Sequence, residues 1–119
     1  MTETAAIQKS PQPFPKSMLI EHLQTLGVQP GMTLLVHSSL SQLGYVPGGP
    51  VAVIQALQEL LTAAGTLVMP THSSDYSDPE PWQNPPAPKA WHQIIRDEMP
   101  AFDPLLTPTR GLGIIPELF

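Results

Sequence analysis

The sequence has no cysteine among its 119 residues, few aromatic side chains and little charge. Without cysteine, disulfide bonds, thiolate catalysis and cysteine-ligated zinc are excluded. No apolar run approaches the roughly 20 residues of a membrane span. Residues 1–6 lack the basic and apolar regions of a signal peptide. We therefore expect a cytoplasmic protein with no membrane partner.

The charge that is present is acidic, with a formal net charge of -5 at pH 7. An acidic balance argues against nucleic-acid binding through phosphates. It is compatible with a cationic substrate, although net charge bears first on solubility. No two histidines have metal-ligand spacing such as i, i+4, so we expect no metal. Hydrophobic residues make up 41% of the chain, which suffices for the core of one small domain.

Apolar periodicity predicts the order of the elements. Residues 1–16 are polar and rich in proline, which is typical of a flexible arm, and residues 17–119 then form part of a single domain. Ser17 is placed to cap a short helix that Gly27 ends, and residues 32–37 form an apolar strand expected to be buried on both faces. A second helix begins at Pro50 and ends at Gly65, and its apolar stripe contains Val53, Ile54, Leu57, Leu60 and Leu61.

A second short apolar strand, residues 66–69, follows that helix. Strand, helix and strand of this length make a βαβ unit, in which the two strands are parallel and the crossover is right-handed. The fold class is therefore α/β. Trp91, Ile94 and Ile95 predict a further brief helix, and residues 114–119 are apolar.

The first strand stops abruptly in a polar turn, His37-Ser38-Ser39-Leu40-Ser41, and Gly48-Gly49 then leads into the helix. Ligands in α/β proteins bind where a strand's carboxyl end feeds such a turn. Hydroxyls, an imidazole and free backbone amides suit phosphate or an amide-bearing ligand. The alternatives are that His37 is a hydrogen-bonded residue at a strand end and that the serines form a turn.

Two later segments carry further polar groups. Thr71 opens a long polar loop with Asp75, Tyr76 and Asp78. A loop this long beyond a strand end is usually functional or disordered, and its carboxylates either bind a cation or form a solvated acidic surface. Thr109, Arg110 and Gly111 form a second turn. There Arg110 either clamps a phosphate or pairs with Asp103 or Glu117.

Taken in order, these segments resemble the antibiotic N-acetyltransferase family, the aminoglycoside 3-N-acetyltransferases. The resemblance runs from about Leu34 to Phe119. It is carried by His37-Ser38-Ser39-Leu40-Ser41, Gly48-Gly49, Gly65-Thr66-Leu67-Val68-Met69-Pro70-Thr71, Trp82-Gln83-Asn84-Pro85-Pro86, Met99-Pro100-Ala101-Phe102-Asp103-Pro104, Thr107-Pro108-Thr109-Arg110-Gly111-Leu112-Gly113 and Ile115-Pro116-Glu117-Leu118-Phe119.

The resemblance implies transfer of an acetyl group from acetyl-coenzyme A (acetyl-CoA) to the 3-amino group of an aminoglycoside antibiotic, and hence antibiotic resistance. It also implies an α/β sandwich of this family's own type. The residues that would line the coenzyme path are His37, Ser38, Ser39, Leu40, Ser41, Thr71, Thr109, Arg110 and Gly111. Asp75, Tyr76 and Asp78 would border the antibiotic, whose positive charges suit carboxylates.

The family's members are about twice this length, so the chain resembles an N-terminal fragment of one. None of the four histidines matches the family's catalytic His-Pro segment, and the general base is expected beyond Phe119. A truncated sheet is expected to leave an apolar face exposed. We expect the isolated chain to be inactive. The alternatives are a non-catalytic acyl-CoA-binding chain and an N-acetyltransferase for another amine. The sequence does not indicate the oligomeric state.

Overall fold

The computed structural model describes residues 2–119. The chain divides into two compact units, one formed by residues 72–110 and the other by the remaining residues. The division into an arm of residues 1–16 and a domain portion of residues 17–119 stays a prediction. The elements are α1 (Glu3–Lys9), α2 (Lys16–Thr25), β1 (Thr33–Leu35), η1 (Leu40–Leu43), α3 (Gly49–Leu61), β2 (Thr66–Val68), η2 (Lys89–Trp91), α4 (His92–Glu98) and α5 (Ile114–Leu118).

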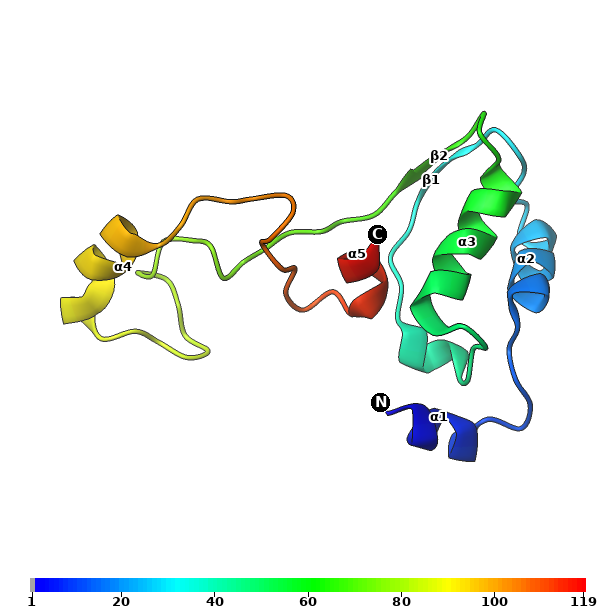
Figure 1. Cartoon of the computed structure of the whole chain (residues 1–119), viewed down its shortest axis with the longest axis horizontal. Coiled ribbons are helices and arrows are strands. Elements are labelled where there is room, and N and C mark those ends of the chain that lie inside the picture. The colour runs from blue at the N-terminus through cyan, green and yellow to red at the C-terminus, as the bar shows by residue number, and fades with distance from the viewer. Residues whose placement is uncertain (1) are drawn as a thin grey trace. The chain divides into compact units, whose positions relative to one another are not determined.

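The larger unit is built around the predicted βαβ segment (Figure 1). β1 and β2 pair in parallel, with Leu34 opposite Leu67, and α3 connects them. Parallel strands run in the same direction, so the chain must return from the end of the first strand to the start of the second. A tight turn is too short for this, and a helix makes the connection. The structure thus confirms an α/β arrangement with a small parallel sheet.

Helix α3 provides most of the buried hydrophobic residues of the larger unit. Its buried stripe is Ala52, Val53, Ala56, Leu57, Leu60 and Leu61, which confirms the predicted helical periodicity. Helices α2 and α5 both pack on α3, and Figure 1 shows α2 alongside it. Lys16 and Glu59 also form an ion pair between α2 and α3, with 2.6 Å between Nζ and Oε1.

The strand that was expected to be buried on both faces is buried on one. Leu34, Val36 and Leu67 pack against the core, whereas Leu35 is 61% exposed and Val68 is 41% exposed. Side chains alternate along a strand, so one side of this sheet faces α3 and the other does not. The expected exposed apolar face is therefore present.

Two predicted helix ends are also corrected. Ser17 lies within α2 and does not cap it, because the extended Pro15 occupies the N-cap position. Helix α3 ends at Leu61 instead of continuing to Gly65, and Thr62 follows with a positive φ of 62°. The Leu61 carbonyl accepts a hydrogen bond from the Gly31 N–H at 2.8 Å, which ties the end of α3 to the turn before β1.

Gly65 allows this close approach of three backbone segments. A Cβ placed there would lie 2.6 Å from the Leu61 carbonyl oxygen and 2.8 Å from the Met32 carbonyl oxygen. The Met32 carbonyl also accepts the Thr66 N–H at 3.0 Å, where β2 joins β1. A side chain at Gly65 would therefore separate the sheet from α3.

Of the described residues 2–119, no helix is both long enough and apolar enough to cross a membrane.

The Gly65→Ala variant is expected to lower the free energy of unfolding by about 1–3 kcal/mol, since backbone atoms must shift to admit the methyl group. Gln55→Ala, at an exposed position in the middle of α3, is the control and should leave the free energy of unfolding nearly unchanged. Urea unfolding followed by circular dichroism measures both. A Gly65→Ala variant as stable as Gln55→Ala would contradict the close-packing account.

Candidate functional site

The carboxyl end of β1 opens into a pocket of about 850 Å³ in the larger unit. Four segments line it: the start of α1, the loop after β1, the start of α3 and the turn before α5. They contribute Thr2, Glu3, Ala6, Ser38, Ser39, Leu40, Ser41, Gly44, Tyr45, Val46, Gly48, Gly49, Pro50, Gly111, Leu112, Gly113 and Ile114. We call this the site-loop pocket.

The serine loop, residues 38–41, brings hydroxyls to the site-loop pocket. The Ser38 hydroxyl is buried and has no hydrogen-bond partner in the described part of the chain. A buried hydroxyl without a partner costs free energy and is uncommon in folded proteins. The Ser39 and Ser41 hydroxyls lie 3.3 Å apart. Ser38 lines the pocket, and its hydroxyl is the buried polar group there that lacks a partner among the described residues.

Backbone amides supply the pocket's other polar groups. No side chain caps the N-terminus of α3, where Gly48 has a positive φ of 84°. The Gly49 N–H donates to the Val46 carbonyl at 2.8 Å, and Pro50 has no N–H, so neither of these lining residues offers a free donor. What the start of α3 presents to the pocket is the positive end of the helix dipole. Across the pocket, Gly111 and Gly113 have positive φ values of 74° and 85°. Such a site attracts an anion.

Glu3 is the one charged side chain among the described residues that line the pocket, and neither Lys nor Arg is found there. A carboxylate repels phosphate and accepts hydrogen bonds from N–H groups. The pocket is therefore asymmetric. Its α3 and glycine side suits an anion, and its α1 side suits a neutral or N–H-bearing group.

The structure brings five of the predicted coenzyme residues together here: Ser38, Ser39, Leu40, Ser41 and Gly111. His37 and Thr71 are both exposed, and neither lines this pocket. Thr109 and Arg110 belong to the other unit. The roles predicted for all nine residues remain predictions.

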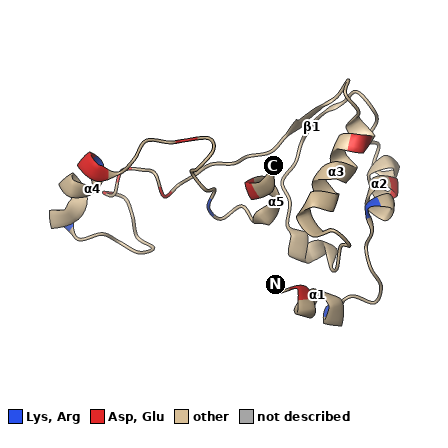
Figure 2. Ribbon diagram, viewed as in Figure 1, with Lys and Arg blue, Asp and Glu red and all other residues tan. Residues whose placement is uncertain are grey.

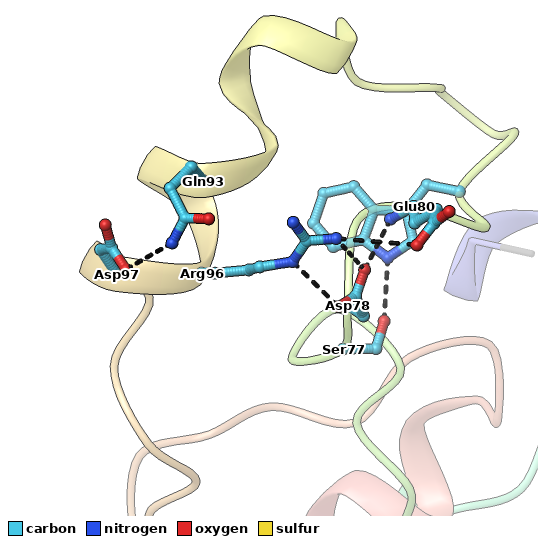
Figure 3. A network of polar contacts seen from close by, with 7 residues as sticks. Ser77, Asp78, Glu80, Gln93, Arg96 and Asp97 are labelled. Atoms are coloured by element: carbon cyan, nitrogen blue, oxygen red, sulfur yellow. Dashed lines mark hydrogen bonds and ion pairs between the residues drawn. The ribbon is translucent and has the colours of Figure 1, made fainter.

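In the unit of residues 72–110, both arginines of the chain pair with the predicted substrate carboxylates. Arg96 binds Asp78 with two hydrogen bonds, Nε to Oδ2 and Nη2 to Oδ1, each 3.0 Å long (Figure 3). Glu80 also approaches Arg96, with 3.7 Å between Oε2 and Nη2. Arg110 forms an ion pair with Asp75 and donates to the Asn84 carbonyl at 3.3 Å. The sequence predicted a phosphate, Asp103 or Glu117 as the partner of Arg110, and it did not predict Asp75.

The Asp78 pair shifts both ionisation equilibria. The hydrogen bonds from Arg96 hold the pKa of Asp78 below its ordinary value of 3.8, and the backbone N–H of Glu80 lowers it further. The same contact with Asp78 raises the pKa of Arg96. Figure 2 shows acidic residues on α4 of this unit, where Asp97 and Glu98 lie beside Arg96 in the sequence. The Asp78 carboxylate, whose pKa is lowered, is therefore ionised at neutral pH.

A second pocket, of about 480 Å³, lies within this unit. Polar groups of Ser73, Tyr76, Ser77 and Asp78 share it with apolar groups of Ile95, Met99 and Phe102. The Ser77 hydroxyl accepts the Trp82 indole N–H at 2.9 Å and donates to the Ser74 carbonyl at 2.7 Å. Two of the three predicted substrate residues, Tyr76 and Asp78, thus line one pocket, and Asp75 does not.

Sequence reasoning missed several residues of these sites. Thr2, Glu3 and Ala6 lie in the segment predicted to be a flexible arm, and a weak helix-capping pattern at Thr2 was the available signal. Tyr45 was not singled out. Arg96 lies 18 residues from Asp78, and no local pattern in the sequence connects them.

Comparisons with known proteins agree with the resemblance seen in the sequence. Residues 35–119 match the family model for aminoglycoside 3-N-acetyltransferase. The SPbeta prophage-derived aminoglycoside N(3')-acetyltransferase-like protein YokD of Bacillus subtilis is 52% identical over 114 residues, which are 95% of this chain and 42% of that protein. Aminoglycoside N(3)-acetyltransferase VIII of Streptomyces fradiae is 38% identical over 118 residues, 98% of this chain and 40% of that protein.

The fold agrees as well. The crystal structure of YokD from Bacillus subtilis superposes with a TM-score of 0.92 at 50% sequence identity, covering 97% of this chain and 43% of that one. The chain therefore spans about two fifths of the length of the relatives it matches. On the family match and these similarities together, the chain belongs to the aminoglycoside 3-N-acetyltransferase family.

Proposed function

We propose that this chain carries the coenzyme-binding part of an acetyl-CoA-dependent aminoglycoside 3-N-acetyltransferase, with the coenzyme in the site-loop pocket. The observation that carries this proposal is the buried, unpartnered hydroxyl of Ser38 at the end of β1. It lines the same pocket as the uncapped start of α3 and the Gly111–Gly113 turn.

The chemistry of the pocket fits the parts of coenzyme A. Its phosphates suit the positive dipole end at the start of α3 and the backbone amides of the Gly111–Gly113 turn. The amide-bearing pantetheine arm suits the serine hydroxyls and Glu3, which accept N–H donors. A solved structure of a relative, AAC-IIIb, contains coenzyme A. The two structures superpose with a TM-score of 0.66 at 26% identity, and the superposition covers 90% of this chain and 39% of AAC-IIIb.

The coenzyme supplies the acetyl group as a thioester, and an acceptor amine attacks that group after losing a proton. That attack needs a general base, because an ammonium group has no free electron pair. No histidine is among the described residues that line the site-loop pocket. The proposal keeps the base beyond Phe119, in the portion of the relatives that this chain does not span.

The loop of residues 72–110 is proposed to bind the aminoglycoside through Asp75, Tyr76 and Asp78. Arginine already satisfies both carboxylates, but the pairs are open to water, with Asp75 44% exposed and Asp78 54% exposed. Exposed ion pairs contribute little net free energy, so the ammonium groups of a polycation can compete with the guanidinium groups. A related acetyltransferase structure contains gentamicin, at 35% identity and a TM-score of 0.68, covering 93% of this chain and 35% of that one.

A different acceptor amine is the second candidate. YokD, at 52% identity, is named as an acetyltransferase-like protein. Residues of the site, more than the fold, decide which amine is accepted.

The function is tested by acetyl-CoA-dependent acetylation of gentamicin, followed as release of free thiol. The 119-residue chain adds no background thiol because it has no cysteine, and a reaction without acetyl-CoA gives the background of the longer product. The 119-residue chain is expected to bind acetyl-CoA in isothermal titration but to release no thiol. A product that extends beyond Phe119 through the family's remaining sequence is expected to release it.

Acetylation by the purified 119-residue chain would contradict the placement of the base beyond Phe119. Absence of acetyl-CoA binding would contradict the coenzyme pocket. Acetylation of other amines in place of gentamicin by the longer product would establish the second candidate.

The Ser38→Ala variant is expected to bind acetyl-CoA about fivefold to tenfold more weakly, through loss of one hydrogen bond. Its thermal stability without ligand should equal or exceed that of the unmodified chain, because a buried hydroxyl without a partner is removed. Ser17→Ala, at an exposed position in α2, is the control and should change neither quantity. A Ser38→Ala variant with lower stability and unchanged affinity would show that Ser38 has a structural role only.

The lowered pKa of Asp78 predicts a pH dependence. Because the pKa in the folded chain lies below 3.8, this group stabilises the fold above that pH, and the contribution is lost as the pH falls through the lower value. An NMR titration of the Asp78 carboxyl should give a midpoint below 3.8 that returns toward 3.8 in Arg96→Gln. Arg110→Gln, whose guanidinium pairs with Asp75, should leave the Asp78 midpoint unchanged. Equal midpoints in the unmodified chain and Arg96→Gln would refute the assignment.

A further inference from the structure

Helix α1 is held to the larger unit by contacts beyond its own C-terminus. It has no buried residue, and Ile7 is 54% exposed. The Ser10 hydroxyl accepts the Tyr45 N–H at 2.8 Å and donates to the Ala6 carbonyl at 2.6 Å. The Phe14 N–H donates to the Tyr45 carbonyl at 2.8 Å. Docking of α1 thus depends on two backbone groups of Tyr45: its N–H donates to Ser10, and its carbonyl accepts from Phe14.

Gly44 makes room for the Ser10 hydroxyl. It has a positive φ of 78°, and a Cβ there would lie 2.6 Å from Ser10 Oγ. The loop after β1 and the segment after α1 therefore fit together at backbone level. The fit is local, and its strength is that of a few hydrogen bonds rather than that of a packed core.

The docked helix forms one wall of the site-loop pocket. Thr2, Glu3 and Ala6 line the pocket together with Ser38 and Ser41. A ligand that fills the pocket therefore touches a helix that opens more easily than the core. By linkage, a ligand that contacts the docked helix must favour docking, and docking must favour the ligand by the same factor.

We propose that Ser10 is a positioning residue for the coenzyme pocket, which it completes by docking α1. This inference rests on the proposed function, since the ligand is coenzyme A. Ser10 does not line the pocket and acts through Thr2, Glu3 and Ala6. Coenzyme binding and closure of the N-terminal wall are one coupled equilibrium.

The test follows trypsin cleavage of the Lys9–Ser10 bond by mass spectrometry, with and without coenzyme A. This bond lies between α1 and the residue that docks it. Coenzyme A at saturation is expected to slow its cleavage about fivefold, the effect of one coupled hydrogen bond. Cleavage after Lys89, in the other unit, serves as the internal reference.

Ser10→Ala is expected to abolish this protection and to weaken coenzyme A binding about fivefold in isothermal titration. Thr25→Ala is the matched control, because the Thr25 hydroxyl also bonds a carbonyl four residues earlier, Glu21 at 3.0 Å, at the end of α2. It should leave both quantities unchanged. A merely structural role for Ser10 would lower the melting temperature without changing affinity.

The outcomes separate this inference from the proposed function. Coenzyme A binding without protection at Lys9 overturns the inference alone, as does equal affinity in Ser10→Ala and Thr25→Ala. No coenzyme A binding by the unmodified chain overturns both. If Ser10→Ala does not fold, protection of the Lys9–Ser10 bond in the unmodified chain still tests whether coenzyme binding and docking of α1 are coupled, and its absence overturns the inference.

Discussion

The apolar stripe of α3 is the constraint on which the rest of the larger unit depends. Its buried residues hold the sheet on one side and receive α2 and α5. Val46, Met69 and Ile115, from three separate parts of the chain, belong to the same buried cluster. Ile115 is 1% exposed and anchors α5, so the preceding Gly111–Gly113 turn is brought to the pocket where β1 ends. Packing against one helix thus assembles a polar site from distant segments.

The site itself departs from what favours stability alone. Ser38 places a buried hydroxyl where no described group satisfies it, and α3 begins without a side-chain cap. The buried hydroxyl costs free energy as long as nothing bonds to it. Such a local cost is typical of a position where a ligand completes the hydrogen bonding. In the unit of residues 72–110 the polar groups are already satisfied, because Arg96 and Arg110 pair with Asp78 and Asp75. Binding of a cationic substrate there is therefore an exchange of partners.

The parts of the fold that follow from local sequence pattern were predictable. The stripe of Val53, Leu57 and Leu61 identified α3, and the two apolar runs beside it identified a parallel pair of strands. Ser38–Ser41 were predicted as site residues from their place after an apolar strand, and Gly111 from the family resemblance. The structure brings both to one pocket. These are features for which neighbours in sequence determine the outcome.

What was missed depends on pairs far apart in the chain. Ser10 and Tyr45 are 35 residues apart, and Arg110 and Asp75 are also 35 apart. No periodicity connects such residues, so neither the α1 wall nor the arginine pairs could be predicted. The burial of β1 on both faces was wrong for a related reason, because an apolar run does not reveal how many layers will cover it.

The most direct test of the coenzyme pocket is an NMR titration of the 119-residue chain with coenzyme A, observing backbone amides. The account predicts that the largest shift changes map to Ser38–Ser41, to the start of α3 and to Gly111–Gly113. Changes confined to residues 72–110, or spread evenly over the chain, would contradict it.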